Sequence, residues 1–369
     1  MPACPVLLMV RQLDHGGSER QAAEIAKNLD RSRFLPHAGV FRAGGLRWRE
    51  LHEAGIPVVR FPVDSLADLR GIPAIARYVW EQGIRLIHTF DVPTNLYAAP
   101  AARLAGCEVV VTSQRAHRGL EPRSRPWLRL VDFLSDGVVV NCDFLRRHLV
   151  EEERTPAGRV HLCYNGINPV TFRPRGGGER PEPLQGASLV IGVVCVLRPE
   201  KGLNTLLEAF ARVKDRQPGM KLAVVGSGSC LPELCAQAQR LGIVEDCVFE
   251  PSTADVPRWL GAIDIFVLPS WSEAFSNSLM EAMACGCCAV ASRVGGNPEL
   301  VCEGETGLLF EAGDAAGLAT ALERLIARPE WRAELACNGM RRVRERFGIE
   351  QAARRMEEIY RLLLSREGM

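Results

Sequence analysis

The chain has 369 residues, of which 47% are hydrophobic and 24% charged, and this is the composition of a globular enzyme rather than a disordered or fibrous protein. Its 45 lysine and arginine residues nearly cancel its 44 aspartate and glutamate residues, and the net charge of +1 argues against general nucleic-acid binding, which needs a basic excess. The length exceeds one typical hydrophobic core and suits two α/β domains.

The sequence carries no recognisable targeting or membrane segment. Only a short apolar run precedes Arg11, without the basic leader and longer apolar core of a signal peptide. No apolar stretch reaches the roughly 18–20 residues that a membrane-spanning helix needs. The 13 cysteines are scattered, and their one local cluster, Cys285, Cys287 and Cys288, lacks a second pair at metal-ligand spacing, which indicates reduced, buried thiols and no metal site. We therefore expect a cytoplasmic protein without a metal cofactor.

In the first half, short apolar runs alternate with helical stretches such as 19–29 and 73–81. The runs are filled with Val, Ile and Leu without polar alternation, as in strands covered by helices on both faces. They predict strands at 6–10, 37–41, 57–60, 85–89, 108–112, 137–141 and 159–163. Repeated strand–helix–strand units predict a parallel, doubly wound sheet.

The loop after the first predicted strand carries paired glycines. Gly16 and Gly17 permit close approach of the main chain to a phosphate or sugar. Ser18 and Gln21 fit a capping box, so we expect the helix to begin at Ser18. We expect Glu19 to fix the loop rather than to react.

A second candidate loop follows the predicted strand 108–112 and contains Arg115, His117 and Arg118. An isolated histidine is more often structural or solvated, so the sequence does not choose between Arg115 and His117. The segment from Arg115 to Arg129 contains five arginines and one glutamate, with apolar residues between them. This patch indicates either a solvated basic face or contact with an anionic membrane or a phosphorylated, lipid-linked acceptor.

The segment 173–183 holds three glycines and three prolines and predicts a linker, after which the alternation restarts. The sequence therefore divides into an N-terminal domain at 1–172, a linker at 173–188, a second domain at 189–349 and a terminal helix at 350–369. Strands are predicted at 189–196, 220–225, 246–249, 264–268 and 287–291, and helices at 314–328, 330–346 and 350–364. Ligands of such sheets bind at the carboxyl ends of the strands.

Two glutamates follow the predicted strand 264–268. Glu273 lies in the loop, and Glu281 lies about one turn inside a helix whose cap we place near Ser276 or Asn277. The start of this helix presents free N–H groups that suit a diphosphate. Taken alone, the pair is equally compatible with two solvated glutamates.

Two further loops add groups of the same kind. Gly295 and Gly296 permit close main-chain approach, and the next residues, Asn297 and Pro298, fit an N-cap and first helical residue, although a plain turn is the alternative. After strand 189–196, Arg198 and Lys201 supply two cations that would stabilise the charge of a departing diphosphate without a metal, unless they are merely solvated loop charges.

The stretch 190–312 resembles the family 4 retaining glycosyltransferases, whose two Rossmann-like domains face each other across a cleft in the GT-B fold. The family's E-x7-E motif is matched by Glu273 and Glu281, and a Gly-Gly-x-Pro-Glu loop follows at 295–299. The resemblance implies that Glu273 contacts the donor sugar and Glu281 the ribose. It also implies that the sugar and phosphate pocket is lined by backbone of Phe275, Ser276, Asn277, Gly295 and Gly296.

The resemblance has further implications. Arg198 and Lys201 resemble the diphosphate clamp, Gly16 and Gly17 resemble a donor-contacting loop, and Arg115, His117 or Arg118 would lie near the sugar and the acceptor. The family implies a nucleotide-sugar donor, a glycan or lipid-linked acceptor, retention of anomeric configuration, and a terminal helix that returns to the first domain. The location expected from the missing signal segment is the cytoplasm, and the basic patch at 115–129 suggests peripheral contact with the inner face of the membrane.

One departure concerns the base pocket. The family commonly has a glycine where this chain reads Phe249-Glu250-Pro251, so we do not infer uracil over guanine. A nucleotide-sugar 2-epimerase and a non-catalytic sugar-nucleotide-binding protein share the architecture and remain alternatives. A nicotinamide dehydrogenase is excluded, because no G-x-G-x-x-G follows the first strand.

Overall fold

The computed structural model describes residues 2–14, 16–65, 68–115, 131, 133–174 and 179–366. The chain divides into two compact units. Unit 1 comprises Met1–Gly166 and Ile349–Met369, and unit 2 comprises Ile167–Gly348. Each unit is built around its own parallel sheet, which confirms the prediction of two Rossmann-like domains.

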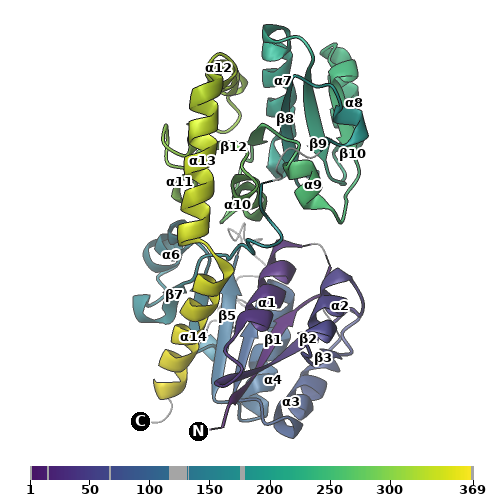
Figure 1. The fold of residues 1–369 in the computed structure, drawn as a ribbon. Helices are drawn as coiled ribbons and strands as arrows, with labels where there is room; N and C mark the ends of the chain where they lie inside the picture. Colours follow the sequence, from purple (N-terminus) through teal and green to yellow (C-terminus); the bar gives the residue numbers. More distant parts are fainter. Residues whose placement is uncertain are drawn as a thin grey trace. The chain divides into compact units, whose positions relative to one another are not determined.

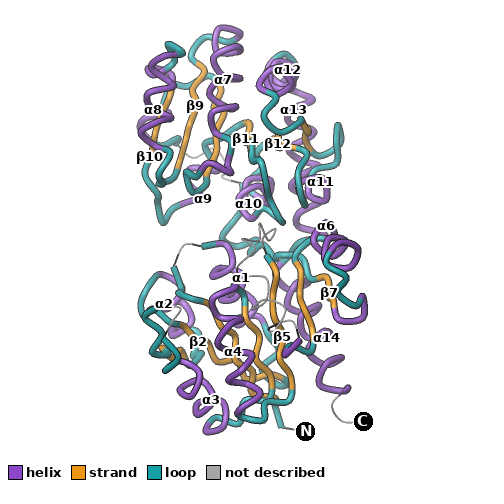
Figure 2. The backbone as a smooth tube through the Cα atoms, turned by 180° about the vertical axis from the view of Figure 1, so that it is seen from behind, coloured by secondary structure: helices purple, strands orange, loops and turns teal. Residues whose placement is uncertain are grey.

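Unit 1 contains a seven-stranded parallel sheet in the order β3-β2-β1-β4-β5-β6-β7. Its strands are β1 (Cys4–Val10), β2 (Phe34–Val40), β3 (Val58–Arg60), β4 (Leu86–Thr89), β5 (Val109–Gln114), β6 (Gly137–Val140) and β7 (Val160–Leu162). Its helices include α1 (Gly17–Asn28), α2 (Leu46–Glu53), α3 (Gly71–Glu81), α4 (Val92–Leu104), α6 (Asp143–Arg147) and α14 (Ile349–Arg366). Helices lie on both sides of the strands (Figure 2).

Both faces of this sheet are buried, which explains the unbroken apolar runs in the sequence. Along β1, Val6 and Leu8 belong to one core with residues of α1 and α14. Leu7 and Met9 belong to a second core with residues of α3 and α4. Every side chain of such a strand is therefore packed, and none needs to be polar.

Helix α14 is the end of the chain, yet it belongs to unit 1 (Figure 1). Its residues Met356, Ile359 and Leu363 are buried in the core that they share with α1 and β1. Tyr360 is also buried there, and its ring meets Phe34 edge to face at 5.7 Å between centroids. The helix thus completes the hydrophobic core of the first unit.

Unit 2 contains a six-stranded parallel sheet in the order β10-β9-β8-β11-β12-β13. Its strands are β8 (Leu189–Val194), β9 (Met220–Val225), β10 (Cys247–Glu250), β11 (Ile265–Leu268), β12 (Cys288–Ser292) and β13 (Gly307–Phe310). Its helices are α7 (Leu203–Val213), α8 (Leu231–Arg240), α9 (Val256–Leu260), α10 (Asn277–Ala284), α11 (Asn297–Leu300), α12 (Ala315–Ile326) and α13 (Pro329–Arg346). Strand β13 was not predicted, because it is four residues long and begins with glycine.

The predicted linker at 173–188 is wrong as a boundary. The units meet in sequence at 166/167 and 348/349, and the described part of the segment 173–188 packs on unit 2. Arg180 donates to the Asp264 carboxylate at 2.8 Å, and Leu184 is fully buried in a short 3₁₀ turn. Glycine and proline indicate irregular backbone, but irregular backbone can still make tertiary contacts.

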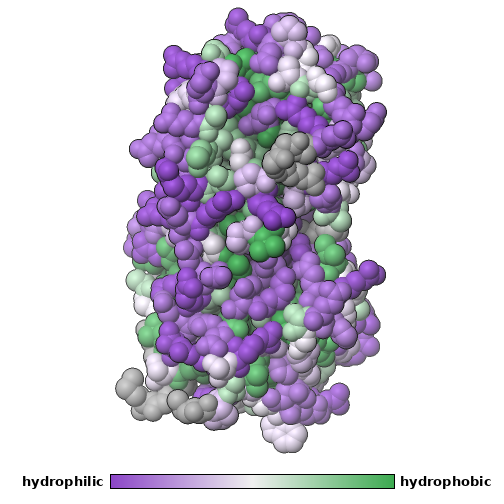
Figure 3. Space-filling view, viewed as in Figure 1, coloured by the Kyte–Doolittle hydropathy of each residue, from purple (hydrophilic) through white to green (hydrophobic). Residues whose placement is uncertain are grey.

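Among the described helices, none combines the length and the apolar character needed to cross a bilayer. On the face of the molecule seen in Figure 3, hydrophobic residues lie in separate small patches among hydrophilic ones. Isolated apolar residues of this kind are normal on protein surfaces.

Candidate active site

The sheet of unit 2 reverses its order between β8 and β11, and the carboxyl ends of strands at such a point are where ligands of α/β sheets bind. The loops that follow these two strands are tied together. The Trp271 N–H donates to the Glu200 carbonyl at 2.8 Å. Gly202 has a φ of +61° and lies so close to the Pro269 carbonyl that any Cβ there would overlap the oxygen. The two loops therefore hold each other in one arrangement.

The tied loops bring Lys201 and Glu273 together. The Lys201 Nζ lies 2.6 Å from Oε1 of Glu273, and the Ser270 hydroxyl donates to the same oxygen at 2.8 Å. The two side chains are 21% and 10% exposed, so the pair is mostly shielded from water. An ammonium group has three N–H donors, and Glu273 engages one of them. The others can serve a ligand.

Arg198 lies on the same loop as Lys201 but is not part of this pair. Its guanidinium is 62% exposed, and the carboxylate of Glu200 lies 3.7 Å from it. The structure therefore brings together two of the three charged residues that the sequence predicted to converge. Cys195 lies in the same loop, and burial raises its pKa to about 12, so its thiol is protonated at neutral pH.

Helix α10 begins beside this pair, as predicted. Ser276 is its N-cap, and the Ser276 hydroxyl accepts a hydrogen bond from the Leu279 N–H at 3.3 Å. Asn277 is the first helical residue, and Glu281 is buried within the helix. The Phe275 ring packs against Phe347 with 5.2 Å between centroids. The side chain of Phe275 thus supports the turn, and its backbone leads into the helix.

The paired glycines after β12 pack against the Glu273 loop. Gly295 has a φ of +53°, and a Cβ there would overlap the Glu273 carbonyl oxygen. The Gly296 N–H donates to the Ala274 carbonyl at 2.6 Å. The predicted cap at Asn297 is wrong, because α11 begins at Asn297 and the Asn297 amide donates back to the Ser292 carbonyl at 3.0 Å. A helix thus begins after the paired glycines, as predicted, but α11 spans only four residues.

In unit 1, the loop after β1 is held by Glu19. Its Oε2 accepts from the N–H groups of Asp14 at 2.9 Å and Gly16 at 2.8 Å, as expected of a residue that fixes the loop. Helix α1 begins at Gly17 with Gly16 as N-cap, so the capping box predicted for Ser18 is wrong. A carboxylate two residues nearer the helix start than Gln21 satisfies these donors instead.

Gln21 has a different role, which the sequence did not reveal. It is buried, and its Nε2 donates to the Gly166 carbonyl at 2.9 Å while its Oε1 accepts from the Gly166 N–H at 2.8 Å. A Cβ on Gly166 would lie 2.7 Å from the Ile349 Cα. Gln21 thus fixes the backbone where the chain leaves unit 1.

The predicted residues after β5 are only partly described. His117, Arg118 and the basic patch beyond them lie outside the described residues. Arg115 is described, and its Nη1 donates to the Asn165 Oδ1 at 2.7 Å. Its guanidinium carbon lies 4.6 Å from the centroid of the Phe90 ring. Burial lowers the pKa of Arg115 to about 10, so the group is charged at neutral pH.

His88 in β4 is a buried polar residue that sequence reasoning missed. Its Nδ1 lies 2.7 Å from the Tyr360 hydroxyl, and its Nε2 lies 2.7 Å from the Ser113 hydroxyl. Burial, with a smaller contribution from the charge of Arg115, lowers the pKa of His88 well below its usual value. The ring is therefore neutral and joins α14 to the sheet.

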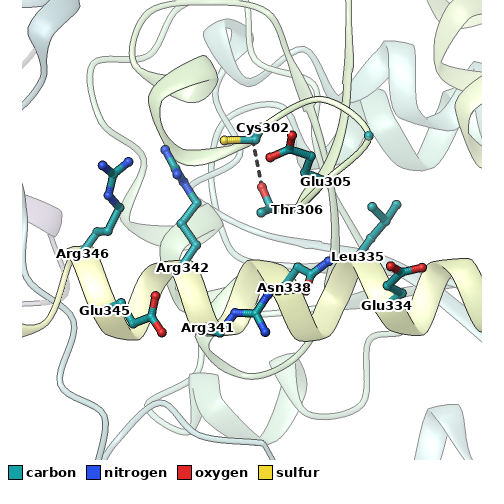
Figure 4. A pocket seen from close by; sticks show the side chains of 11 residues that line it. Cys302, Glu305, Thr306, Glu334, Leu335, Asn338, Arg341, Arg342, Glu345 and Arg346 are labelled. Carbon is teal, nitrogen blue, oxygen red and sulfur yellow. Dashed lines mark hydrogen bonds between the residues drawn. The ribbon is translucent and has the colours of Figure 1, made fainter.

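A pocket of about 450 Å³ lies between α13 and the loop before β13 (Figure 4). Arg342 and Arg346 extend from the helix toward this loop, where the Cys302 N–H donates to the Thr306 hydroxyl at 2.8 Å. Arg342 also donates to the carbonyls of Glu299 and Leu300. The pocket is lined by residues of α13 and of the loop at the amino end of β13, whereas the tied loops that hold Lys201 and Glu273 follow the carboxyl ends of β8 and β11.

Across the described ranges, no three or more His, Cys, Asp and Glu residues are grouped so that they could hold a metal ion. The cysteines at 285, 287 and 288 are buried. Burial raises the pKa of Cys288 to about 12 and that of Cys287 well above its ordinary value, so these two thiols stay protonated.

Residues 16–166 match the Glycosyl transferase 4-like domain, and residues 179–342 match the Glycosyl transferases group 1 family. The D-inositol 3-phosphate glycosyltransferase of Thermomonospora curvata is 32% identical over 362 residues, which are 90% of this chain and 78% of that protein. The chain therefore belongs to the group 1 family of glycosyl transferases. The enzyme of the same name from Rhodococcus erythropolis is 30% identical, and the matched region covers 92% of the present chain and 76% of the Rhodococcus enzyme.

Other similar proteins extend the comparison. A GDP-mannose-dependent alpha-(1-6)-phosphatidylinositol monomannoside mannosyltransferase of Mycolicibacterium smegmatis is 29% identical, over 69% of this glycosyltransferase and 72% of that protein. The structure of HepE of Anabaena with UDP and glucose is 24% identical, with a TM-score of 0.83 over 96% and 98% of the two chains. A glycosyltransferase of Rickettsia africae is 19% identical, with a TM-score of 0.84 over 98% and 99%. These structures establish the GT-B fold, and nothing in the comparisons supports an epimerase.

Proposed function

We propose that this glycosyltransferase moves a hexose from a nucleotide-diphosphate sugar to a glycan or lipid-linked acceptor, with retention of anomeric configuration and without a metal ion. The observation that carries the proposal is the pair of Lys201 and Glu273, held by two tied loops at the point where the sheet order of unit 2 reverses. A cation and a hydroxyl acceptor side by side suit a sugar linked to a diphosphate.

The donor follows from the chemistry of this pair and from the relatives. The mannosyltransferase relative is named as GDP-mannose-dependent, and HepE was solved with UDP-glucose. Both are nucleotide-diphosphate sugars, so we assign this donor class to the present chain and leave the base open. The loop that would meet the base follows Glu250, the last residue of β10, whose carbonyl accepts from the Gly226 N–H at 2.8 Å.

Each group in the site has a defined task in the proposed reaction. Lys201 uses its free N–H groups to stabilise the charge that grows on the diphosphate as the bond to the sugar C1 breaks. The N-terminus of α10 adds main-chain N–H groups and a partial positive charge. No described residue hydrogen-bonds to Oε2 of Glu273, so this oxygen can accept from a sugar hydroxyl. Glu281 would hold the ribose.

Retention is the outcome that the family resemblance implies, and among the described residues no second carboxylate pairs with Lys201 to act as an enzyme nucleophile. Among the described residues, Glu273 is the carboxylate at the tied loops that faces Lys201, and its Oε1 already accepts two hydrogen bonds. Cys195 is protonated and cannot serve. In the proposed step the acceptor oxygen bonds to C1 on the face that the diphosphate leaves, and the acceptor proton passes to the departing phosphate oxygen.

The experiment is a donor panel with matched variants. Nucleotide release from UDP- and GDP-sugars should require an acceptor and should disappear in Glu273→Gln. The control is Glu323→Gln, which removes a surface carboxylate of the same unit paired with Arg216 at 2.6 Å. Proton NMR of the product reports the anomeric configuration. An inverted product, or full turnover by Glu273→Gln, would remove the proposed mechanism.

A further inference from the structure

The Arg115 guanidinium lacks a charged partner among the residues that the structure describes. Across the described ranges no carboxylate pairs with its guanidinium, and its hydrogen bond to Asn165 is to a neutral amide. Other arginines of unit 1 differ, since Arg85 pairs with Glu108 at 2.6 Å and Arg103 pairs with Asp136 at 2.6 Å. A shielded cation without a counter-charge is costly, so its retention requires a reason.

The ionisable groups that act on Arg115 do not supply the missing charge. They are the Cys163 thiol and the Tyr360 phenol. Burial raises the pKa of Cys163 to about 11 and that of Tyr360 well above its ordinary value, so both are neutral at pH 7. The guanidinium, by contrast, stays protonated. Neither neighbouring group therefore balances the charge of Arg115.

The Arg115 guanidinium is fixed on two sides, by the Phe90 ring and by Asn165, and we call this position the seat of Arg115. Phe90 follows β4, and its N–H donates to the Met9 carbonyl at 2.9 Å, so the ring under Arg115 is fixed between β1 and β4. These strands are where the sheet order of unit 1 reverses. Asn165 follows β7 and is itself buried. A planar cation positioned on two sides, with donors left over, is arranged to bind an oxyanion in a defined orientation.

Unused polar atoms surround the seat. The Nε of Arg115 and the Oδ1 of Asn141 are buried without a hydrogen-bond partner in the described structure, as are both amide atoms of Gln114. Asn141 and Gln114 are only 3% and 4% exposed. Gln114 of β5 pairs with Val140 of β6. The residues that follow them, Arg115 and Asn141, therefore lie next to each other at the carboxyl ends of these two strands. Buried orphan groups of this kind indicate a missing partner.

We propose that Arg115 binds a phosphate group of the acceptor and that the Asn141 amide oxygen accepts a hydrogen bond from a hydroxyl beside it. The acceptor is then a phosphorylated polyol, with its phosphate either free or part of a lipid headgroup. This inference rests on the proposed glycosyl transfer only in calling the phosphorylated ligand an acceptor. Phosphate binding at Arg115 can be tested without any sugar donor.

The first experiment measures phosphate binding directly. With UDP or GDP at saturation, whichever the protein binds, the cations of unit 2 are occupied, and inorganic phosphate should then raise the Tm of the parent protein. It should raise the Tm of Arg85→Gln equally, because Arg85 lies before β4 at the opposite edge of the sheet. It should not raise the Tm of Arg115→Gln. An equal rise in Arg115→Gln would overturn the proposal.

Stability without phosphate separates a binding role from a structural one. Because Arg115→Gln removes an unbalanced cation, the variant should unfold at no lower denaturant concentration than Arg85→Gln. A much larger loss would give Arg115 a structural role and count against the seat. Should the glutamine variant fail to fold, Asn165→Asp provides the second test. Its new carboxylate would neutralise Arg115 in place, so the phosphate-induced rise should vanish although the arginine remains.

The second experiment uses transfer. Arg115→Gln should raise the KM for a phosphorylated acceptor about 10- to 100-fold, as expected for loss of a charge-assisted hydrogen bond, and leave the KM for the donor unchanged. D-inositol 3-phosphate in solution and phosphatidylinositol in vesicles distinguish a free ester from a lipid headgroup. Equal use of D-inositol 3-phosphate and unphosphorylated inositol by the parent would overturn the inference. If no donor is turned over at all, the proposed function fails, and the phosphate-induced shift in Tm still decides the seat.

Discussion

Replacing Lys201 with methionine tests the central pair, because methionine keeps the apolar stem and removes the charge. In the ligand-free protein the change leaves the Glu273 carboxylate with Ser270 as its remaining side-chain partner. Exposed ion pairs contribute about 0–1 kcal/mol, and breaking a fully buried pair costs roughly 3–5 kcal/mol. The two side chains are 21% and 10% exposed, which places this pair between those limits. We expect the free energy of unfolding to fall by roughly 1–3 kcal/mol.

The effect on transfer should be larger than the effect on stability. Lys201 offers fixed N–H donors to a leaving group whose negative charge grows in the transition state, and removal of one such donor from an enzyme typically lowers kcat about 10²- to 10³-fold. The same donors also contact the ground-state diphosphate, so UDP affinity should fall more modestly. This difference between kcat and affinity is the signature of a group that acts on the leaving phosphate.

The assay combines steady-state nucleotide release, calorimetric titration with UDP and GDP, and urea unfolding on the same preparations. Lys214→Met is the matched control. Lys214 also belongs to unit 2 and lies 3.4 Å from the Asp215 carboxylate, but it precedes β9 and is thus at the other edge of the sheet. A Lys201→Met protein that loses stability as expected and keeps its full kcat would show that the lysine only supports the fold, and our assignment of the diphosphate site would be refuted.

Four further outcomes are expected. Glu281→Ala should weaken donor binding about tenfold, as for loss of hydrogen bonds to a charged acceptor, and identical donor affinity by calorimetry would contradict its ribose role. Gly295→Ala should destabilise the protein by more than about 1 kcal/mol and abolish transfer, because alanine disfavours a φ of +53° and its Cβ would overlap the Glu273 carbonyl; wild-type melting would refute that packing. Transfer should persist in excess EDTA, whereas strict metal dependence would require another mechanism. Finally, because burial lowers the pKa of His88, the unfolded chain binds a proton that the native state does not. Stability should therefore fall by up to about 1.4 kcal/mol per pH unit below about pH 6.5, and His88→Phe should show a shallower dependence in urea unfolding.

The alternation of apolar runs and helical stretches was sufficient to predict the two parallel sheets, because strands buried on both faces leave a continuous apolar signal. It did not reveal β13, whose four residues begin with Gly307 and carry too little of that signal. Nor did it place the boundary between the units. The glycines and prolines after residue 173 predicted a linker, whereas Arg180 and Leu184 tie the described part of the segment to unit 2.

The candidate site was predictable where its residues follow strands in sequence. Lys201 and Glu273 lie in the loops that follow β8 and β11, so the adjacency of these strands brings them together. Residues whose partners are distant in sequence could not be found in this way. His88 meets Tyr360, 272 positions later, and Gln21 meets Gly166, 145 positions later. No local pattern marks a partner that far away.

The return of α14 to unit 1 has a consequence for domain exchange among these enzymes. Residues 1–166 expressed alone would lack Met356, Ile359 and Leu363, and would leave the surface that these side chains cover open to water and to aggregation. A chimera that takes its first domain from this chain must therefore also take the last 21 residues of this chain, 349–369, together with that domain. The two crossover points are adjacent, since the Ile167 N–H donates to the Phe347 carbonyl at 2.8 Å, so both splices can be made at a single location in space.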